Sequence, residues 1–390
     1  MIPYGKHYID DDDIQAVVDV LKSGVLTQGH AVEAFERGIA DYVGARYAVA
    51  VSSGTAALHL AALAASVGPG TTLVTSPITF VASANAGAYA GGKVAFADID
   101  PKTANMSPMA LAETLASNPN TRAIVPVHFA GLPCDMSTIK HLADKAGAVV
   151  IEDAAHALGA RYPDGRRVGC CADSLMTIFS FHPVKAIAAG EGGMITTNDD
   201  GVYRHLLRLR SHGINKFDDP LLLKNQAFTD GVQNPWYYEM QELGFHYRIT
   251  DIQCALGYSQ LRKLDSFLAR RRALVKRYDE GLAGLRHVHP AQVSGRERSG
   301  HHLYVVRIDF ESVGMSRNTL MLTLRQRGIG TQVHYIPVPM QPYYRAQGDT
   351  VAACPNACAY YEQALTLPLF YDLSDSEQTH VINVLKELLA

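Results

Sequence analysis

One lysine of this sequence stands in surroundings that are unusual for a charged side chain. Lys185 lies in FSFHPVKAIAAGEGG (179–193), among small and apolar residues, with Ser180 five residues before it. An apolar pocket disfavours the charged form of a lysine, and the neutral amine that results is a nucleophile able to form a Schiff base. The alternative is an ordinary lysine whose stem crosses an apolar patch while its charge stays in water.

A second stretch, Ser52-Ser53-Gly54-Thr55, follows the apolar YAVAV and precedes a segment rich in Ala and Leu. A turn of small residues at a helix N-terminus offers free N–H groups and hydroxyls to a phosphate. A plain N-cap with a tight turn explains the same residues.

A third stretch, Glu152-Asp153-Ala154-Ala155-His156, follows the apolar AVVI. A buried carboxylate is unfavourable without a partner, which would be a protonated pyridine nitrogen or an arginine. Taken together, the three stretches supply the contacts that pyridoxal phosphate needs. The lysine holds the aldehyde, the aspartate keeps the ring nitrogen protonated, and the turn holds the phosphate. The chain has no G-x-G-x-x-G or P-loop pattern, which argues against a dinucleotide or a nucleoside triphosphate as the ligand.

The elements that must position these residues alternate between strands and helices over the first two thirds of the chain. Strands are expected at 47–53, 71–76, 93–99, 123–129 and 148–154, and helices at 32–45, 54–65, 111–118 and 136–147. This order predicts an α/β fold with a mostly parallel sheet. Ligands of such sheets lie outside the carboxyl ends of the strands, where the polar residues occur.

The pattern changes after about residue 250. One long helical region is expected over 250–282, then a strand at 302–310, a helix at 318–328 and a final helix that opens with Ser374 and Glu377 at capping-box spacing. We therefore expect a large α/β domain over 26–250 and a smaller α+β domain over 251–390. The N-terminal segment 1–25 is expected to pack with the smaller domain.

Composition excludes several classes of function. Of the 390 residues, 47% are hydrophobic and 19% charged, and the formal net charge of -3 comes without a dense Lys/Arg block, which argues against nucleic acid. No long apolar run or signal peptide is visible, so no membrane partner is expected. The six cysteines form no metal or disulfide pattern, which favours reduced thiols, no bound metal and a cytoplasmic location.

Eight motifs together resemble the DegT/DnrJ/EryC1/StrS family of sugar aminotransferases. They are SSGTAALHL, SPITFVASANA, PVHFAG, IEDAAHALGA, FSFHPVK, EGGMITTND, LRSHGI and LGFHYRITDIQCALGYSQL. The likeness runs in order from LTQGHAVEAFE (26–36) to QVHYIPVPMQPYYR (332–345). It implies a pyridoxal 5'-phosphate-dependent transferase of fold type I, similar to aspartate aminotransferase. It also implies a homodimer with its active site at the subunit interface and L-glutamate as amino donor.

The resemblance also implies roles for individual residues. Lys185 and Asp153 match the catalytic pair, the Schiff-base lysine and the partner of the pyridine nitrogen. The other cofactor-binding positions implied are Ser53, Gly54, Thr55, Ala56, Phe80, Ala155, His156, Ser180 and His246. His246 departs from the family, which commonly has Asn there, reaching the cofactor phosphate from the other subunit; a histidine can also donate to phosphate. Thr27, Arg248, His334 and Tyr335 lie in stretches similar to substrate contacts, although each also fits a structural role.

Within the family, the chain is most similar to enzymes of pseudaminic acid biosynthesis. These aminate C4 of a UDP-linked 2-acetamido-2,6-dideoxy-4-keto sugar, and RSHGI, QVHY and SFHPVK carry the likeness. Another UDP-, dTDP- or GDP-linked keto sugar is an alternative substrate. A dehydratase of the family has histidine in place of Lys185. A non-catalytic regulator of the same fold is expected to have lost Lys185 or Asp153, and both are present.

Overall fold

A seven-stranded sheet forms the centre of the chain, which the computed structural model describes over residues 1–215, 219–348 and 351–389. Its strand order is β1-β7-β6-β5-β4-β2-β3. The strands are β1 (Tyr47–Val51), β2 (Thr72–Thr75), β3 (Lys93–Phe96), β4 (Thr121–Val125), β5 (Val149–Asp153), β6 (Met176–Ser180) and β7 (Gly193–Thr197). Among these described strands β7 alone runs opposite to the other six. The predicted α/β fold with a mostly parallel sheet is therefore confirmed.

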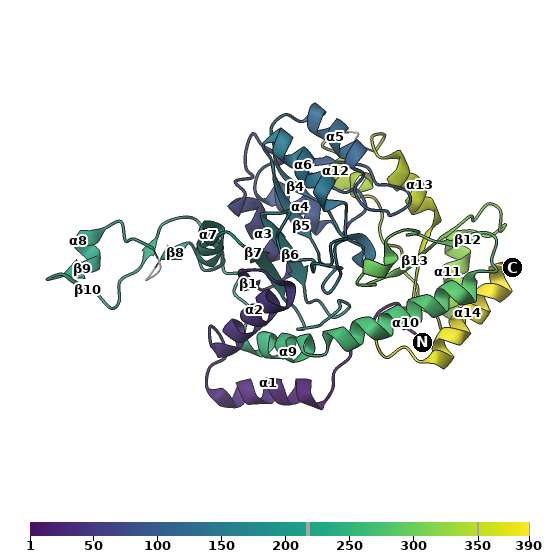
Figure 1. Ribbon diagram of the computed structural model, residues 1–390, viewed down its shortest axis with the longest axis horizontal. Helices are drawn as coiled ribbons and strands as arrows, with labels where there is room; N and C mark the ends of the chain where they lie inside the picture. The colour runs from purple at the N-terminus through teal and green to yellow at the C-terminus, as the bar shows by residue number, and fades with distance from the viewer. Residues whose placement is uncertain (216–218, 349–350, 390) are drawn as a thin grey trace.

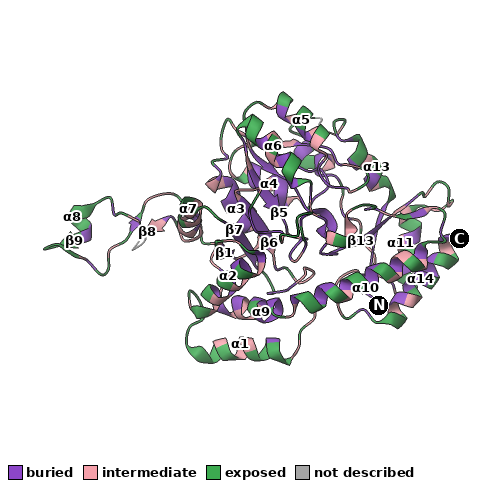
Figure 2. Cartoon of the chain, viewed as in Figure 1, coloured by how far each residue is buried: buried purple, intermediate pink, exposed green. Residues whose placement is uncertain are grey.

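Helices cover both faces of this sheet, as Figure 1 shows. Val49 and Ile151 face one layer, and Ala50 and Val150 face the other, because successive side chains of a strand alternate between its faces. The first layer contains α3 (Gly54–Ala64), α4 (Ala82–Tyr89) and α7 (Asp200–Arg210); the second contains α2 (His30–Val43), α5 (Pro108–Ser117) and α6 (Met136–Ala146). Burial on both faces explains the nearly continuous apolar runs of the strands (Figure 2).

A smaller antiparallel sheet lies in the C-terminal part. Its strands are β12 (Val288–Pro290), β13 (Tyr304–Ile308) and β14 (Ala364–Leu367), and it packs with α10 (Leu264–Leu282), α11 (Arg317–Gln326) and α14 (Asp375–Leu389). The capping box predicted for the last helix is present. The Ser374 amide donates to Glu377 at 2.9 Å, and the Glu377 amide donates to the Ser374 hydroxyl at 3.2 Å.

The region expected as one long helix over 250–282 is two helices, α9 (Asp251–Leu261) and α10. The chain contains no glycine or proline at the break, so the sequence gives no signal for it. At the break Lys263 turns its ammonium toward the first helix, α1 (Asp11–Ser23), and pairs with Asp10 and Asp13. Within the described residues, no helix has the length and apolar character needed to cross a membrane.

The first residues of the chain form a strap, residues 2–8, that touches both parts of the molecule. Ile2 forms a parallel bridge with Ile329 in the small part, and the carbonyl of Tyr4 accepts from the Leu369 amide at 3.0 Å. Further on, Gly5 lies against Val184, the residue before Lys185. A Cβ on Gly5 would stand 3.6 Å from the Cβ of Val184. The strap therefore contacts both the small part and the loop of Lys185. The domain boundaries themselves stay a prediction.

Between α7 and α9 the chain forms an arm, described over residues 214–215 and 219–243, that extends away from the body (Figure 1). It contains β8 (Ile214–Asn215), α8 (Lys224–Ala227), β9 (Phe228–Thr229), β10 (Val232–Gln233) and β11 (Glu239–Met240). The Glu239 carboxylate orders the described part of the arm by accepting from the amides of Leu222 and Leu223, both at 2.7 Å. Trp236 is nevertheless 73% exposed, and Leu243 is 76% exposed.

The last two residues of β5 are both acidic and point to opposite faces of the sheet. Glu152 is 1% exposed, and its carboxylate accepts from His128 Nε2 (2.8 Å), Tyr162 Oη (2.5 Å), Ser174 Oγ (2.5 Å) and Thr177 Oγ1 (2.9 Å). Burial opposes its ionisation, but these hydrogen bonds outweigh burial and lower the pKa of Glu152. The sequence left open an arginine as the partner of this acidic pair. Among the described residues no arginine pairs with Glu152, and its basic neighbour is His128.

We expect Glu152→Gln to lower the free energy of unfolding at pH 7 by about 2–4 kcal/mol, since the amide nitrogen would face buried donors. The folded-state pKa of Glu152 lies below its unfolded value near 4.5, so its contribution is present above that pH and is lost as the pH falls. Urea unfolding of wild type and variant at several pH values measures this. A difference that grows on acidification would contradict it.

Candidate active site

Asp153 ends β5 at the carboxyl edge of the sheet, with its side chain on the face opposite to that of Glu152. It is 5% exposed. Its Oδ2 accepts from the Ser83 hydroxyl at 2.6 Å, and its Oδ1 accepts from the Ala155 amide at 3.1 Å. The carboxylate is thus fixed in orientation, and neither of these donors carries a charge.

Lys185 lies in the loop between β6 and β7. The loop is closed by two backbone bonds at 2.9 Å, from the Phe181 amide to the Gly192 carbonyl and from the Ala189 amide to the Phe181 carbonyl. Burial lowers the pKa of Lys185 to about 8, and the charge of Asp153 opposes this shift. In the described part of the chain no hydrogen-bond acceptor meets the ammonium, so the group is available to a ligand.

The turn before α3 lies directly beside Ser180. Ser53 caps the helix by accepting from the Ala56 amide at 3.1 Å, while the amides of Gly54 and Thr55 find no acceptor among the described residues. A Cβ on Gly54 would come within 2.9 Å of the Ser180 Cβ, so only glycine lets the two segments approach this closely. The result is a concave arrangement of free N–H groups and hydroxyls that suits a phosphate.

His156 lies close to Lys185 and is buried. Burial, and then the charge of Lys185, hold its pKa well below the usual range, so the ring is neutral. Its Nε2 bonds to the Tyr335 hydroxyl at 3.2 Å, and its Nδ1 has no partner within the described chain. An unpartnered buried nitrogen beside Lys185 fits the hydroxyl of a pyridine ring held by that lysine.

The small part of the molecule contributes His334 and Tyr335 to the same place. His334 Nδ1 bonds to Thr366 Oγ1 at 2.8 Å, and burial lowers its pKa to about 3, with Lys185 adding to the shift. The Tyr335 ring lies 6.5 Å from that of Phe80, which is 60% exposed and open to a ligand. The predicted substrate contacts His334 and Tyr335 and the predicted stacking residue Phe80 are thus brought together near His156.

For three other predicted residues, no described side-chain contact reaches the groups above. Thr27 forms a bridge with Thr250, and no ion pair of Arg248 is described. The side chain of His246 is exposed and stacks on that of His212 at 5.3 Å. The residue after it, Tyr247, accepts from the Ser52 amide at 2.8 Å, so the backbone of this segment adjoins the turn.

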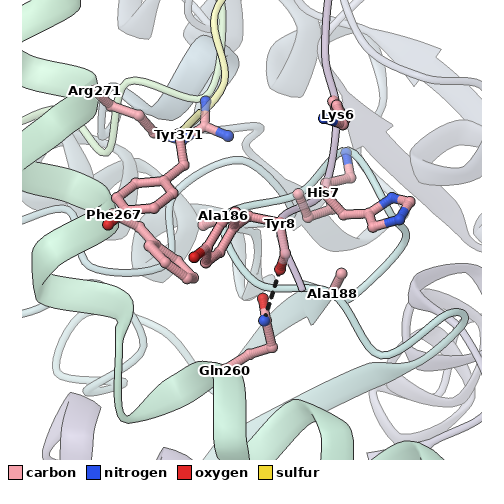
Figure 3. Close-up of a pocket in the computed structure, with 10 residues that line it drawn as sticks. Lys6, His7, Tyr8, Ala186, Ala188, Gln260, Phe267, Arg271 and Tyr371 are labelled. Atoms are coloured by element: carbon pink, nitrogen blue, oxygen red, sulfur yellow. Dashed lines mark hydrogen bonds between the residues drawn. The ribbon is translucent and has the colours of Figure 1, made fainter. Parts of the chain in front are cut away.

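Several residues near the site were missed from the sequence. Ser83, which bonds to Asp153, lies within SPITFVASANA. Its spacing of four residues from Thr79 is the feature of the sequence that could have indicated a pair of neighbouring hydroxyls. His302 is buried with its ring 4.3 Å from that of His156, and no pattern in the sequence marked it. A small cavity is lined by Lys185 and by residues 6–8 of the strap. Figure 3 shows Gln260 at this cavity, where its Nε2 donates to the Tyr8 carbonyl at 2.9 Å.

These groups fit a phosphorylated pyridine aldehyde. The amides of Gly54 and Thr55 with Ser180 would hold the phosphate, Asp153 the ring nitrogen, and His156 the ring hydroxyl. Lys185 would hold the aldehyde carbon. Each of these groups has a free hydrogen-bond donor or acceptor. A buried polar ligand needs such partners, because its own polar atoms must be hydrogen-bonded once they leave water.

Comparison with known proteins agrees with this geometry. A model of the DegT/DnrJ/EryC1/StrS aminotransferase family matches residues 7–386. The chain is 39% identical, over all 390 residues, to the spore coat polysaccharide biosynthesis protein SpsC of Bacillus subtilis (strain 168), and the match covers 100% of this chain and 97% of that protein.

Solved structures give the same result. PseC of Helicobacter pylori, an aminotransferase involved in the biosynthesis of pseudoaminic acid, superimposes with a TM-score of 0.88 at 28% identity, covering 100% of this chain and 99% of PseC. The PLP form of the putative sugar aminotransferase Spr1654 from Streptococcus pneumoniae gives 0.88 at 31% identity, covering 99% and 98%. This chain therefore belongs to the DegT/DnrJ/EryC1/StrS aminotransferase family, and its cofactor is pyridoxal phosphate.

Proposed function

We propose that this enzyme moves an amino group from L-glutamate to C4 of a nucleotide-linked 6-deoxy-4-keto sugar. The acceptor we propose is UDP-2-acetamido-2,6-dideoxy-β-L-arabino-hexos-4-ulose, which would give UDP-4-amino-4,6-dideoxy-N-acetyl-β-L-altrosamine. The observation that carries the aminotransferase chemistry is the partly buried Lys185, with a lowered pKa, beside the fixed carboxylate of Asp153. The whole-chain similarity to PseC supports the choice of sugar.

In the proposed reaction, Lys185 moves the proton. Bound pyridoxal phosphate supplies an electron sink for the carbanion that forms when the substrate carbon loses its proton. As a neutral amine, Lys185 would take the Cα proton of the donor and later return a proton, first as a base and then as an acid. Asp153 would hold the proton on the ring nitrogen, and the neutral His156 would orient the ring through its free Nδ1. The keto sugar then takes the amino group by the same proton transfers in reverse.

A pKa near 8 makes this lysine's reactivity depend on pH near neutrality. In the cofactor-free enzyme, the rate of reaction of Lys185 with pyridoxal phosphate is expected to rise about tenfold per unit below pH 8 and to level off above it, following the neutral fraction. Asp153→Asn is expected to move the inflection to lower pH, because it removes a charge that favours the ammonium. Stopped-flow absorbance against pH measures both. The exposed Lys6→Ala is the control, and an inflection near 10.5 would contradict the expected environment of Lys185.

The identity of the sugar is tested by turnover. The purified enzyme, supplied with glutamate and a panel of UDP-, dTDP- and GDP-linked 4-keto sugars, is expected to convert the UDP-linked 2-acetamido sugar with the highest kcat/KM, as measured by mass detection of the amino product. Lys185→Ala is expected to give no turnover with any member. Conversion of dTDP or GDP sugars alone would overturn the proposed acceptor and leave the aminotransferase chemistry in place. The identity of 39% to SpsC, a spore coat polysaccharide biosynthesis protein, is the observation that favours a sugar other than the proposed one.

We also propose that the enzyme is a homodimer with its active site at the subunit interface. The arm carries exposed apolar side chains away from its own body, and monomeric proteins rarely expose such a set without a partner. His246 follows the arm closely, lies exposed, and makes no described contact with its own phosphate turn. A second copy of the chain would bury the arm and receive His246 from the other subunit.

If the arm is an interface, Trp236→Glu is expected to weaken dimerisation at least tenfold, because a buried aromatic anchor would be replaced by a charge. Sedimentation equilibrium over a concentration series measures this. Met109→Glu is the matched control, since Met109 on α5 is 76% exposed and lies outside the arm. Equal effects of the two substitutions, or a monomeric wild type, would refute the proposed interface.

A further inference from the structure

Two buried hydroxyls connect α4 to the carboxylate of Asp153. Ser83 Oγ lies 2.6 Å from Asp153 Oδ2, and Thr79 Oγ1 lies 2.7 Å from Ser83 Oγ. Ser83 is 0% exposed and Thr79 is 3% exposed, so water does not compete for either group. The two residues are four apart and flank Phe80, which places the hydroxyls and the exposed aromatic on one turn.

The direction of the two hydrogen bonds follows from the chemistry of the groups. An ionised carboxylate only accepts, so the single proton of Ser83 is donated to Asp153. The Ser83 oxygen then accepts, and the proton of the second bond must come from Thr79. The Phe80 carbonyl lies 3.5 Å from Ser83 Oγ, at the limit of a hydrogen bond, and is the weaker acceptor for this proton.

The two hydrogen bonds form a relay that runs from Thr79 through Ser83 to Asp153. This relay differs from the arrangement of donors around Glu152. Glu152 has an imidazole among its donors, whereas Asp153 accepts from the Ser83 hydroxyl and the Ala155 amide, neither of them charged. The Ser83 hydroxyl in turn accepts from Thr79. Within the described chain no arginine or histidine forms an ion pair with Asp153, and the nearby cation is Lys185. The relay therefore satisfies and orients the carboxylate without neutralising it, and the positive charge is left for a ligand to supply.

We propose that the Thr79–Ser83 relay is a positioning device that keeps the carboxylate of Asp153 aimed at the ring nitrogen of the cofactor. This rests on the proposed role of Asp153. With the relay in place, the carboxylate is fixed in the orientation in which it would hold the proton on the ring nitrogen. Without the relay the carboxylate is free to rotate, and its hydrogen bond to the protonated ring nitrogen weakens. The two bonds polarise one another, so Thr79 acts on Asp153 through Ser83.

Four variants of the full-length enzyme test the relay: Ser83→Ala, Thr79→Val, Thr79→Ser and Asp153→Asn. The enzyme is loaded with pyridoxal phosphate labelled with ¹⁵N in the ring, and the ring ¹⁵N shift is measured with the cofactor dissociation constant. Ser83→Ala is expected to move the ¹⁵N resonance toward that of a neutral pyridine and to weaken cofactor binding about tenfold. Thr79→Val is expected to change both in the same direction by less, and Thr79→Ser to restore the wild-type values.

The outcomes separate the relay from the role of Asp153. A wild-type ¹⁵N shift in Ser83→Ala, alongside a changed shift in Asp153→Asn, would refute the relay and leave Asp153 as the partner of the ring nitrogen. An unchanged shift in Asp153→Asn would refute the proposed role of Asp153 itself. If circular dichroism shows that Ser83→Ala does not fold, the nearly isosteric Thr79→Val decides: a wild-type shift there refutes the relay, and a shift toward neutral pyridine that Thr79→Ser reverses supports it.

Discussion

The burial of Asp153 and the partial burial of Lys185 are the constraint on which the rest of the site depends. Burial disfavours the charged ammonium, and a buried carboxylate is tolerated only when its oxygens are bonded. The fold meets both conditions at one edge of the sheet, with the loop of Lys185 closed by backbone bonds and Asp153 held by Ser83 and Ala155. The acidic neighbour, Glu152, is turned to the other face and bonded there, so two adjacent carboxylates do not repel one another across the same pocket.

The sequence was sufficient for the parts of the site that depend on local chemistry. A lysine among small residues, an acidic pair after an apolar strand and a serine-glycine turn before a helix are each visible within a few positions. The mostly parallel sheet that gathers them at one edge followed from the alternation of strands and helices. The family resemblance was needed for His334 and Tyr335, because they come from the small part of the chain and have no local pattern that marks them as ligands.

What the sequence did not reveal depends on distant contacts. Ser83 and Asp153 are seventy positions apart, and His302 meets His156 only after the small sheet has packed against the large one. The break between α9 and α10 is of the same kind, since Lys263 turns to meet Asp10 and Asp13 and no breaking residue is present. In each case the determining partner is hundreds or tens of residues away, and periodicity within one segment carries no information about it.

The strap has a consequence for how the molecule unfolds. In the small part, residues 2–8 bond to Gly328, Gly330 and Leu369. They also lie against Val184 beside the reactive lysine and reach Gln260 at the end of α9. Separating either part from the strap would have to break these contacts, so the strap couples the loop of Lys185 to the small part of the molecule.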